Sequence, residues 1–198
     1  MRNYDFSADE VLEEKEILAE EFWFNSTRDK ADRHLFRNMT FAKELPHHIR
    51  GSFELELHRE DAEAVTALCN NSDLLKFNFY ATALSILLHR YFGENIIFIL
   101  CPYRQFQPGR EADAFFVFRS GVDNNRSFKE LFGQNRSFML QSVRYSAQYQ
   151  DICGYTETDH EKHLNEIVLS VNYSSFASIS CNPVINFCIQ DNNGSAQL

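Results

Sequence analysis

The chain has 198 residues, of which 44% are apolar and 24% are charged, and its net charge is −9. This length suits one domain with a sizeable core, and the composition is that of an ordinary globular protein. The acidic balance, with an isoelectric point near 5.2, argues against nucleic acid or an anionic membrane surface as the main partner.

Targeting signals and cysteine usage predict a cytoplasmic location. No apolar run approaches the roughly 18 residues that a membrane-spanning helix needs. The segment 1–14 is polar and acidic, unlike a secretory signal. The five cysteines contain no C-x-x-C pair and stand mostly among apolar residues, which is typical of reduced thiols.

The N-terminal third predicts two helices on either side of a strand. Ser7 is a suitable N-cap for a helix that runs to about Phe24, with acidic residues in its first turns. Residues 26–50 are expected to be irregular or extended. Strict alternation over 51–58 predicts a half-buried strand, and 61–70 predicts a short helix that ends in an Asn-Asn-Ser turn.

The middle of the chain predicts a buried helix and two buried strands. Apolar residues recur at helical spacing over 77–92, from Phe77 to Tyr91, and Gly93 ends this helix. The continuous apolar run 96–101 predicts a strand covered on both faces. A polar loop then leads to a second apolar run at 114–118.

The C-terminal third completes an α/β pattern. Ser127 is predicted to cap a long helix that extends to about Tyr149, and strands are expected at 166–173 and 184–189. Strands separated by helices predict an α/β sandwich with a mixed, largely non-hairpin sheet and flanking helices. We expect one domain over residues 1–190 and a loose polar tail over 191–198.

The residue types that carry chemistry form no convincing site. His160 and His163 have the i, i+3 spacing of metal ligands, but no third ligand is suitably placed. There is no Gly-x-Ser-x-Gly and no glycine-rich phosphate loop. We therefore expect no metal, no cofactor and no catalytic residue in this chain.

A histidine pair, His47-His48, is the strongest single motif. One large acyltransferase superfamily carries its catalytic base in the pattern His-His-x-x-x-Asp-Gly. Here the pair is followed by Ile49-Arg50-Gly51-Ser52-Phe53, so neither the aspartate nor the glycine falls in place. The pair follows Pro46, and we expect it to lie in a surface turn.

Several short strings carry more information by their order than any of them does alone. They are Tyr4-Asp5-Phe6-Ser7, Phe22-Trp23, the helix 81–91, Gly93-Glu94-Asn95, Cys101-Pro102-Tyr103-Arg104, Ala114-Phe115-Phe116-Val117, Ser127-Phe128 and Tyr149-Gln150-Asp151-Ile152. In this order they resemble the condensation domain of nonribosomal peptide synthetases, from just after its catalytic motif onward. The resemblance covers about residues 4–175.

The resemblance implies half of a two-lobed enzyme. Condensation domains consist of two chloramphenicol-acetyltransferase-like lobes, and the catalytic histidine belongs to the first lobe. This chain is similar to the second lobe, so the implied fold is a single α/β lobe. His47-His48 falls downstream of the position where the catalytic motif belongs. The family forms amide bonds by acyl transfer from a carrier-bound thioester, and the resemblance implies that the catalytic histidine is not among these residues.

Departures from the family pattern predict a partner surface. Phe118-Arg119 stand in place of an Asn-Thr pair, and Tyr149 stands in place of a histidine. Such changes make the face toward the sister lobe more apolar, which favours contact with another protein. The predicted surface consists of Phe116, Phe118, Arg119, Tyr149, Gln150 and Asp151.

The predicted function is a non-catalytic partial condensation domain in a nonribosomal peptide synthetase initiation module. It would dock or stabilise the adenylation domain of the same synthetase, with a peptidyl carrier protein as a second candidate partner. Two alternatives stay open. The chain could complete an acyltransfer site together with a separate first lobe, or it could serve as a carrier-protein binding module.

Overall fold

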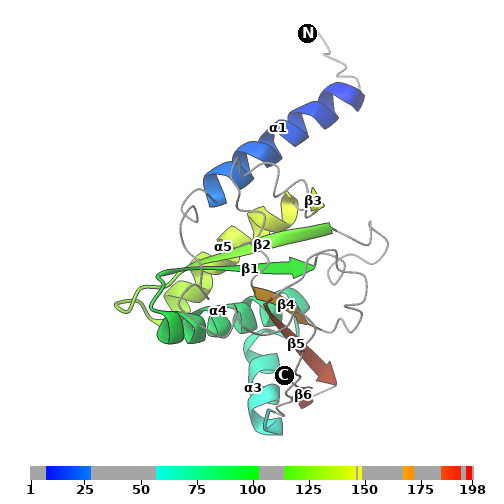
Figure 1. Ribbon diagram of the computed structural model, residues 1–198. Coiled ribbons are helices and arrows are strands. Elements are labelled where there is room, and N and C mark those ends of the chain that lie inside the picture. The colour runs from blue at the N-terminus through cyan, green and yellow to red at the C-terminus, as the bar shows by residue number, and fades with distance from the viewer. Residues whose placement is uncertain are drawn as a thin grey trace, which may run out of the picture.

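The computed structural model describes residues 8–27, 57–102, 114–145, 147–148, 167–171, 184–192 and 195–197. Within these ranges four helices and six strands follow one another along the chain (Figure 1). They are α1 (Ala8–Thr27), α3 (Arg59–Leu68), α4 (Asp73–Phe92), β1 (Ile96–Pro102), β2 (Ala114–Gly121), α5 (Phe128–Arg144), β3 (Ala147–Gln148), β4 (Ile167–Val171), β5 (Ile185–Asn192) and β6 (Ser195–Gln197). The α/β class predicted from the sequence is confirmed.

The strands form one mixed sheet in the order β3-β2-β1-β4-β5-β6. The pairs β1–β4 and β4–β5 are parallel, whereas β1–β2, β2–β3 and β5–β6 are antiparallel. A parallel pair needs a long crossover between its strands, and the connection from β1 to β4 includes β2 and α5. The predicted mixed sheet is therefore present.

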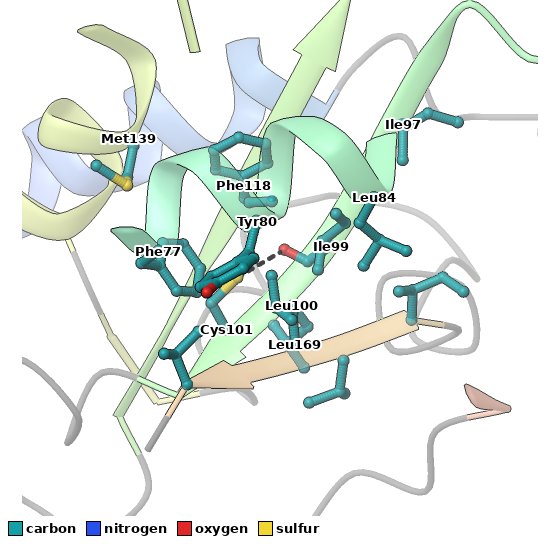
Figure 2. Packing of buried hydrophobic residues seen from close by; sticks show 14 of the residues in the cluster. Phe77, Tyr80, Leu84, Ile97, Ile99, Leu100, Cys101, Phe118, Met139 and Leu169 are labelled. Atoms are coloured by element: carbon teal, nitrogen blue, oxygen red, sulfur yellow. Dashed lines mark hydrogen bonds between the residues drawn. The ribbon is translucent and has the colours of Figure 1, made fainter. Parts of the chain in front are cut away.

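The helices α4 and α5 pack on the same face of the sheet. The ring centroid of Phe77 in α4 lies 5.7 Å from that of Phe116 in β2 and 6.3 Å from that of Phe118. Because side chains alternate along a strand, Phe116, Phe118 and Ser120 all point to this face. Figure 2 shows Phe77 and Tyr80 of α4 projecting toward the strands.

The other face of the central strands is buried as well. Leu100 of β1 pairs in register with Val117 of β2, and Phe98 and Phe115 lie on the same face, two residues from Leu100 and Val117. All four side chains are at most 3% exposed. Burial on both faces explains why β1 and β2 are continuous apolar runs in the sequence and not alternating ones.

Local capping residues set both ends of α4. The Ser72 hydroxyl accepts a hydrogen bond from the backbone N–H of Leu75, so the helix begins at Asp73, four residues before the predicted start. Gly93 ends it in the left-handed conformation, with φ of 74°, and donates its N–H to the His89 carbonyl. The predicted glycine stop is confirmed.

The turn before α4 also follows the prediction. Asn70 and Asn71 have φ of 49° and 55°, values that asparagine tolerates better than most residues because its amide bonds locally. The Asn-Asn-Ser sequence therefore ends α3 and caps α4 within three residues.

The helix α5 starts where the sequence predicts but ends earlier. Ser127 and Glu130 form a reciprocal capping box at its N-terminus. The helix stops at Arg144, not near Tyr149, because Ala147–Gln148 leave the helix and pair with the edge of the sheet as β3. Backbone pairing with β2 replaces the last helical turn that the periodicity predicts.

Two further predictions differ at their boundaries. Thr27 still belongs to α1, where the sequence predicts irregular chain from residue 26; its hydroxyl donates to the Trp23 carbonyl. Of the strand predicted over 51–58, residues 51–56 lie outside the described ranges. Leu57 and His58 are not in a strand, and His58 is the N-cap of α3.

The C-terminus carries a hairpin where the sequence predicts a loose tail. The strand β5 runs through Asp191 and Asn192, and β6 pairs with it antiparallel, with Asn192 opposite Ser195. Polar composition alone concealed this pairing, because backbone hydrogen bonds do not depend on apolar side chains. In the described part of the chain, no helix combines the length and the apolar character that a bilayer span requires.

Candidate functional site

The predicted partner surface is divided by the fold. Phe116 and Phe118 are fully buried and pack against Phe77, so they belong to the core and cannot form an exposed surface. The apolar run at 114–118 predicted a buried strand. Only the packing of α4 on the sheet shows to which face each side chain points. Arg119, the next residue, points to the opposite face and is partly exposed. Tyr149, Gln150 and Asp151 lie outside the described residues.

Nucleophilic and metal chemistry find no support in the described ranges. Complete burial raises the pKa of the Cys101 thiol well above its ordinary value, and desolvation also raises the pKa of Cys69. Both thiols are therefore protonated near neutral pH, which suits structural cysteines. No group of three metal-ligating side chains forms among the residues that the structure describes. The predicted histidine motifs all lie outside those residues, namely His47, His48, His160 and His163.

A buried polar seam runs between α4 and α5, and apolar periodicity did not reveal it. The side-chain amide of Asn135 in α5 donates to the hydroxyl of Thr82 in α4 at 3.1 Å and to that of Ser120 in β2 at 3.0 Å. All three residues are at most 1% exposed. One amide therefore uses both of its N–H donors to join three elements.

The seam continues toward both ends of α4. The Asn78 amide donates to the Phe132 carbonyl at 3.0 Å, and the Ser85 hydroxyl donates to the Ala81 carbonyl at 2.8 Å. The polar positions of α4 recur at i, i+4, i+7 and i+11; they are Asn78, Thr82, Ser85 and His89. The sequence shows this stripe as a row of polar residues within a largely apolar helix. That pattern was the sequence signal for the buried polar seam.

His89 closes the seam and holds the loop before α5. Its Nδ1 lies 2.9 Å from the Glu94 carbonyl oxygen and its Nε2 lies 3.2 Å from the Asn124 Oδ1. Each ring nitrogen therefore faces an oxygen, and the tautomer decides which of them donates its N–H. Both ring nitrogens are occupied, so His89 is a structural residue and not an available base.

The exposed surface carries large apolar side chains on several helices. On α4, Tyr91 is 78% exposed and Leu87 is 47% exposed, although the sequence placed Tyr91 on the buried stripe. They stand one helical turn apart and form a contiguous apolar strip. On α3, Leu68 is 73% exposed. These outer faces, and not the buried phenylalanines of β2, are available for contact with other proteins.

Solved structures identify the fold, whereas sequence comparisons do not. No protein-family model and no curated protein matches the sequence. The starter condensation domain of rhizomide synthetase matches 96% of this chain, with a TM-score of 0.65 and 13% identity, but only 47% of that domain is covered. The X-domain in complex with OxyB from teicoplanin biosynthesis matches 92% of this chain, with a TM-score of 0.68 and 13% identity, over 46% of its own length.

A multidomain protein gives the same match. A four-domain nonribosomal peptide synthetase bound to AMP and glycine matches 90% of this chain, with a TM-score of 0.65 and 13% identity, over 17% of its own length. The chain therefore has the fold of a partial condensation domain. It spans just under half the length of the single condensation domains that it matches. The resemblance drawn from the ordered sequence strings is confirmed at the level of the fold.

Proposed function

We propose that this chain is the second lobe of a condensation domain, without catalysis of its own, and that it serves as a platform for the adjacent adenylation domain in a synthetase initiation module. One observation carries the proposal. Nearly the whole chain matches a condensation domain, yet it covers only 47% of that domain. The residues of this chain therefore correspond to about half of such a domain.

The chemistry of the described residues supports the lack of catalysis. Amide formation requires an amine to attack a thioester while a base or a positioning group manages the amine proton. Among the described side chains, both nitrogens of His89 are engaged and the thiols of Cys69 and Cys101 stay protonated. His47-His48 lacks the aspartate and glycine of the catalytic pattern.

The platform role is supported by the exposed apolar strip and by the structural neighbours. Leu87 and Tyr91 offer apolar area to a partner. Domains of this fold occur inside a four-domain synthetase and, as the X-domain, in a complex with OxyB. A peptidyl carrier protein of the same synthetase is the second candidate partner.

Calorimetric titration against the adenylation domain of the same synthetase tests the platform directly. We expect a dissociation constant of about 1 μM or tighter. Deletion of the lobe from the intact synthetase should lower the soluble yield or the rate of amino-acid activation. Absence of binding at about 100 μM, together with unchanged yield and activation after deletion, would contradict the proposal.

A condensation assay separates the platform from the half-enzyme alternative. The chain is mixed with a separately produced first lobe, a loaded carrier protein and an amine acceptor. We expect no amide above the level formed by the first lobe alone. Amide formation that depends on this chain would replace the platform with an enzyme completed in trans.

A further inference from the structure

The outer face of α5 is basic, although the chain as a whole is acidic. Lys129, Arg136 and Arg144 are exposed, and Leu140 between them is 45% exposed. Their spacing places them within about 80° of one another around the helix. We call these four residues the basic face of α5. The net charge of −9 makes such a local excess of positive charge unusual in this chain.

Nothing on α5 neutralises this face. The helix has one acidic residue, Glu130, and its carboxylate accepts hydrogen bonds from the Ser127 N–H at 2.9 Å and the Ser127 hydroxyl at 2.7 Å. Within the described part of the chain, no ion pair involves Lys129 or Arg136. The basic face is therefore open to an acidic partner.

The outer face of α1 has the opposite charge. Ile17, Glu20, Glu21 and Phe24 are all exposed and follow one another at i, i+3, i+4 and i+7, so they share one side of the helix. We call these residues the acidic face of α1. In the sequence the same repeat extends back through Glu10, Glu13 and Glu14. The whole helix carries seven acidic residues and a single lysine.

Anchoring contacts turn the acidic face of α1 away from its own α5. Trp23, fully buried, donates its indole N–H to the Tyr145 carbonyl at 2.8 Å, and Phe22 packs on Phe138 and Tyr145 with ring centroids 5.6 Å and 5.0 Å apart. These residues lie on the side of α1 opposite Ile17 and Glu21. In Figure 1 the N-terminal end of α1 extends away from the sheet and from the other labelled helices.

The two faces are complementary in charge and in apolar content. The basic face spans about 22 Å from Lys129 to Arg144, and the acidic face spans about 10 Å from Ile17 to Phe24, at 1.5 Å per residue. Each face also offers exposed apolar area, Leu140 on α5 and Ile17 with Phe24 on α1. A helix pair of this kind buries the apolar side chains between flanking ion pairs.

From this complementarity we propose that copies of the chain associate through these faces. The acidic face of α1 in one copy lies on the basic face of α5 in the next copy. Within one chain, Phe138 and Tyr145 hold α1 on the side of α5 opposite the basic face, so the two faces point away from each other and the contact repeats head to tail. Exposed ion pairs are individually weak and are screened by salt, so the association is salt-sensitive. At about 100 mM salt the net repulsion between two acidic chains is screened beyond about 10 Å, whereas direct pairs survive.

Sedimentation velocity of the full chain tests this association over about 1–100 μM protein, at about 100 and 500 mM NaCl. We expect dimers and larger species at the lower salt, with a dissociation constant of the contact at least about ten-fold weaker at the higher salt. The K129E/R136E variant and the E20K/E21K variant should each be monomeric, because each places like charges opposite one another. Mixing them in equal amounts should restore association, because the faces that meet are then complementary again.

The variant R59E/R90E is the matched control. It makes the same change in net charge as K129E/R136E, on the exposed surfaces of α3 and α4, and should leave the association intact. Far-UV circular dichroism verifies that every variant is folded. A wild-type chain that is monomeric at about 100 μM in about 100 mM NaCl, or an association that survives both charge reversals, would overturn the proposal.

Discussion

At the residue scale, the Asn135 amide is the most consequential polar group in the described fold. It donates to Thr82 and Ser120 at 3.1 Å and 3.0 Å with all three residues buried. Replacement by alanine removes both bonds and leaves two hydroxyls in a dry seam. We expect Asn135→Ala to lower the free energy of unfolding by about 2–3 kcal/mol, measured by urea denaturation.

The matched control for this substitution lies two residues further on. The Ser137 hydroxyl makes one exposed hydrogen bond, to the Gly133 carbonyl at 3.3 Å, so Ser137→Ala should change stability by less than about 0.5 kcal/mol. Equal effects of the two substitutions would show that the seam contributes no more than an exposed bond.

Single residues also show the limit of inference from sequence. Apolar runs predicted that Phe116 and Phe118 lie in a strand, but a strand covered on both faces has no alternation to indicate which side chains point to the helices. The predicted surface therefore included two core residues. The polar stripe from Asn78 to His89 was present in the sequence, but its partner Asn135 stands more than 40 positions away, and only the packing of α4 on α5 pairs them.

At the element scale, the helix boundaries that the sequence predicted correctly are set by local signals. The capping box at Ser127 and the glycine stop at Gly93 depend on residues a few positions apart, and the structure has both. The end of α5 at Arg144 depends on the pairing of β3 with the sheet edge, which is a long-range contact. The C-terminal hairpin was missed for the same reason.

The capping box of α5 gives a test with a pH dependence. Hydrogen bonds from Ser127 lower the pKa of Glu130 below its ordinary value of 4.5. A lowered pKa contributes stability that is present above the ordinary pKa and is lost as the pH falls through the folded value. We expect Ser127→Ala to cost about 1 kcal/mol at pH 7, the usual cost of losing a serine N-cap.

Unfolding of the wild type and of Ser127→Ala is therefore measured at pH 7 and at about pH 3. The difference between the two proteins should shrink at the lower pH, because protonated Glu130 accepts these hydrogen bonds less strongly. A difference that is the same at both values would mean that the carboxylate takes no part in the cap.

At the scale of the whole molecule, the short sequence motifs predicted the fold through their order along the chain. No single motif is specific, but their order matches the order of helices and strands. The match to a condensation domain over 96% of this chain agrees with that order. What the sequence did not supply is the set of exposed surfaces. Exposure depends on how the helices pack over the sheet, and both Tyr91 and Phe118 were assigned to the wrong environment until that packing was known.

Cooperative unfolding tests whether residues 1–190 behave as one lobe. Trp23 is the only tryptophan of the chain; it is fully buried and bonds to the Tyr145 carbonyl, so its fluorescence follows the contact of α1 with the end of α5. Far-UV circular dichroism follows all the helices together. In a single cooperative unit the two signals have the same urea midpoint, because α1 cannot leave before the core opens. Measurement in about 500 mM NaCl keeps association of two copies from contributing. We expect coincident midpoints; an earlier fluorescence transition would show that α1 detaches first and that the lobe is not one cooperative unit.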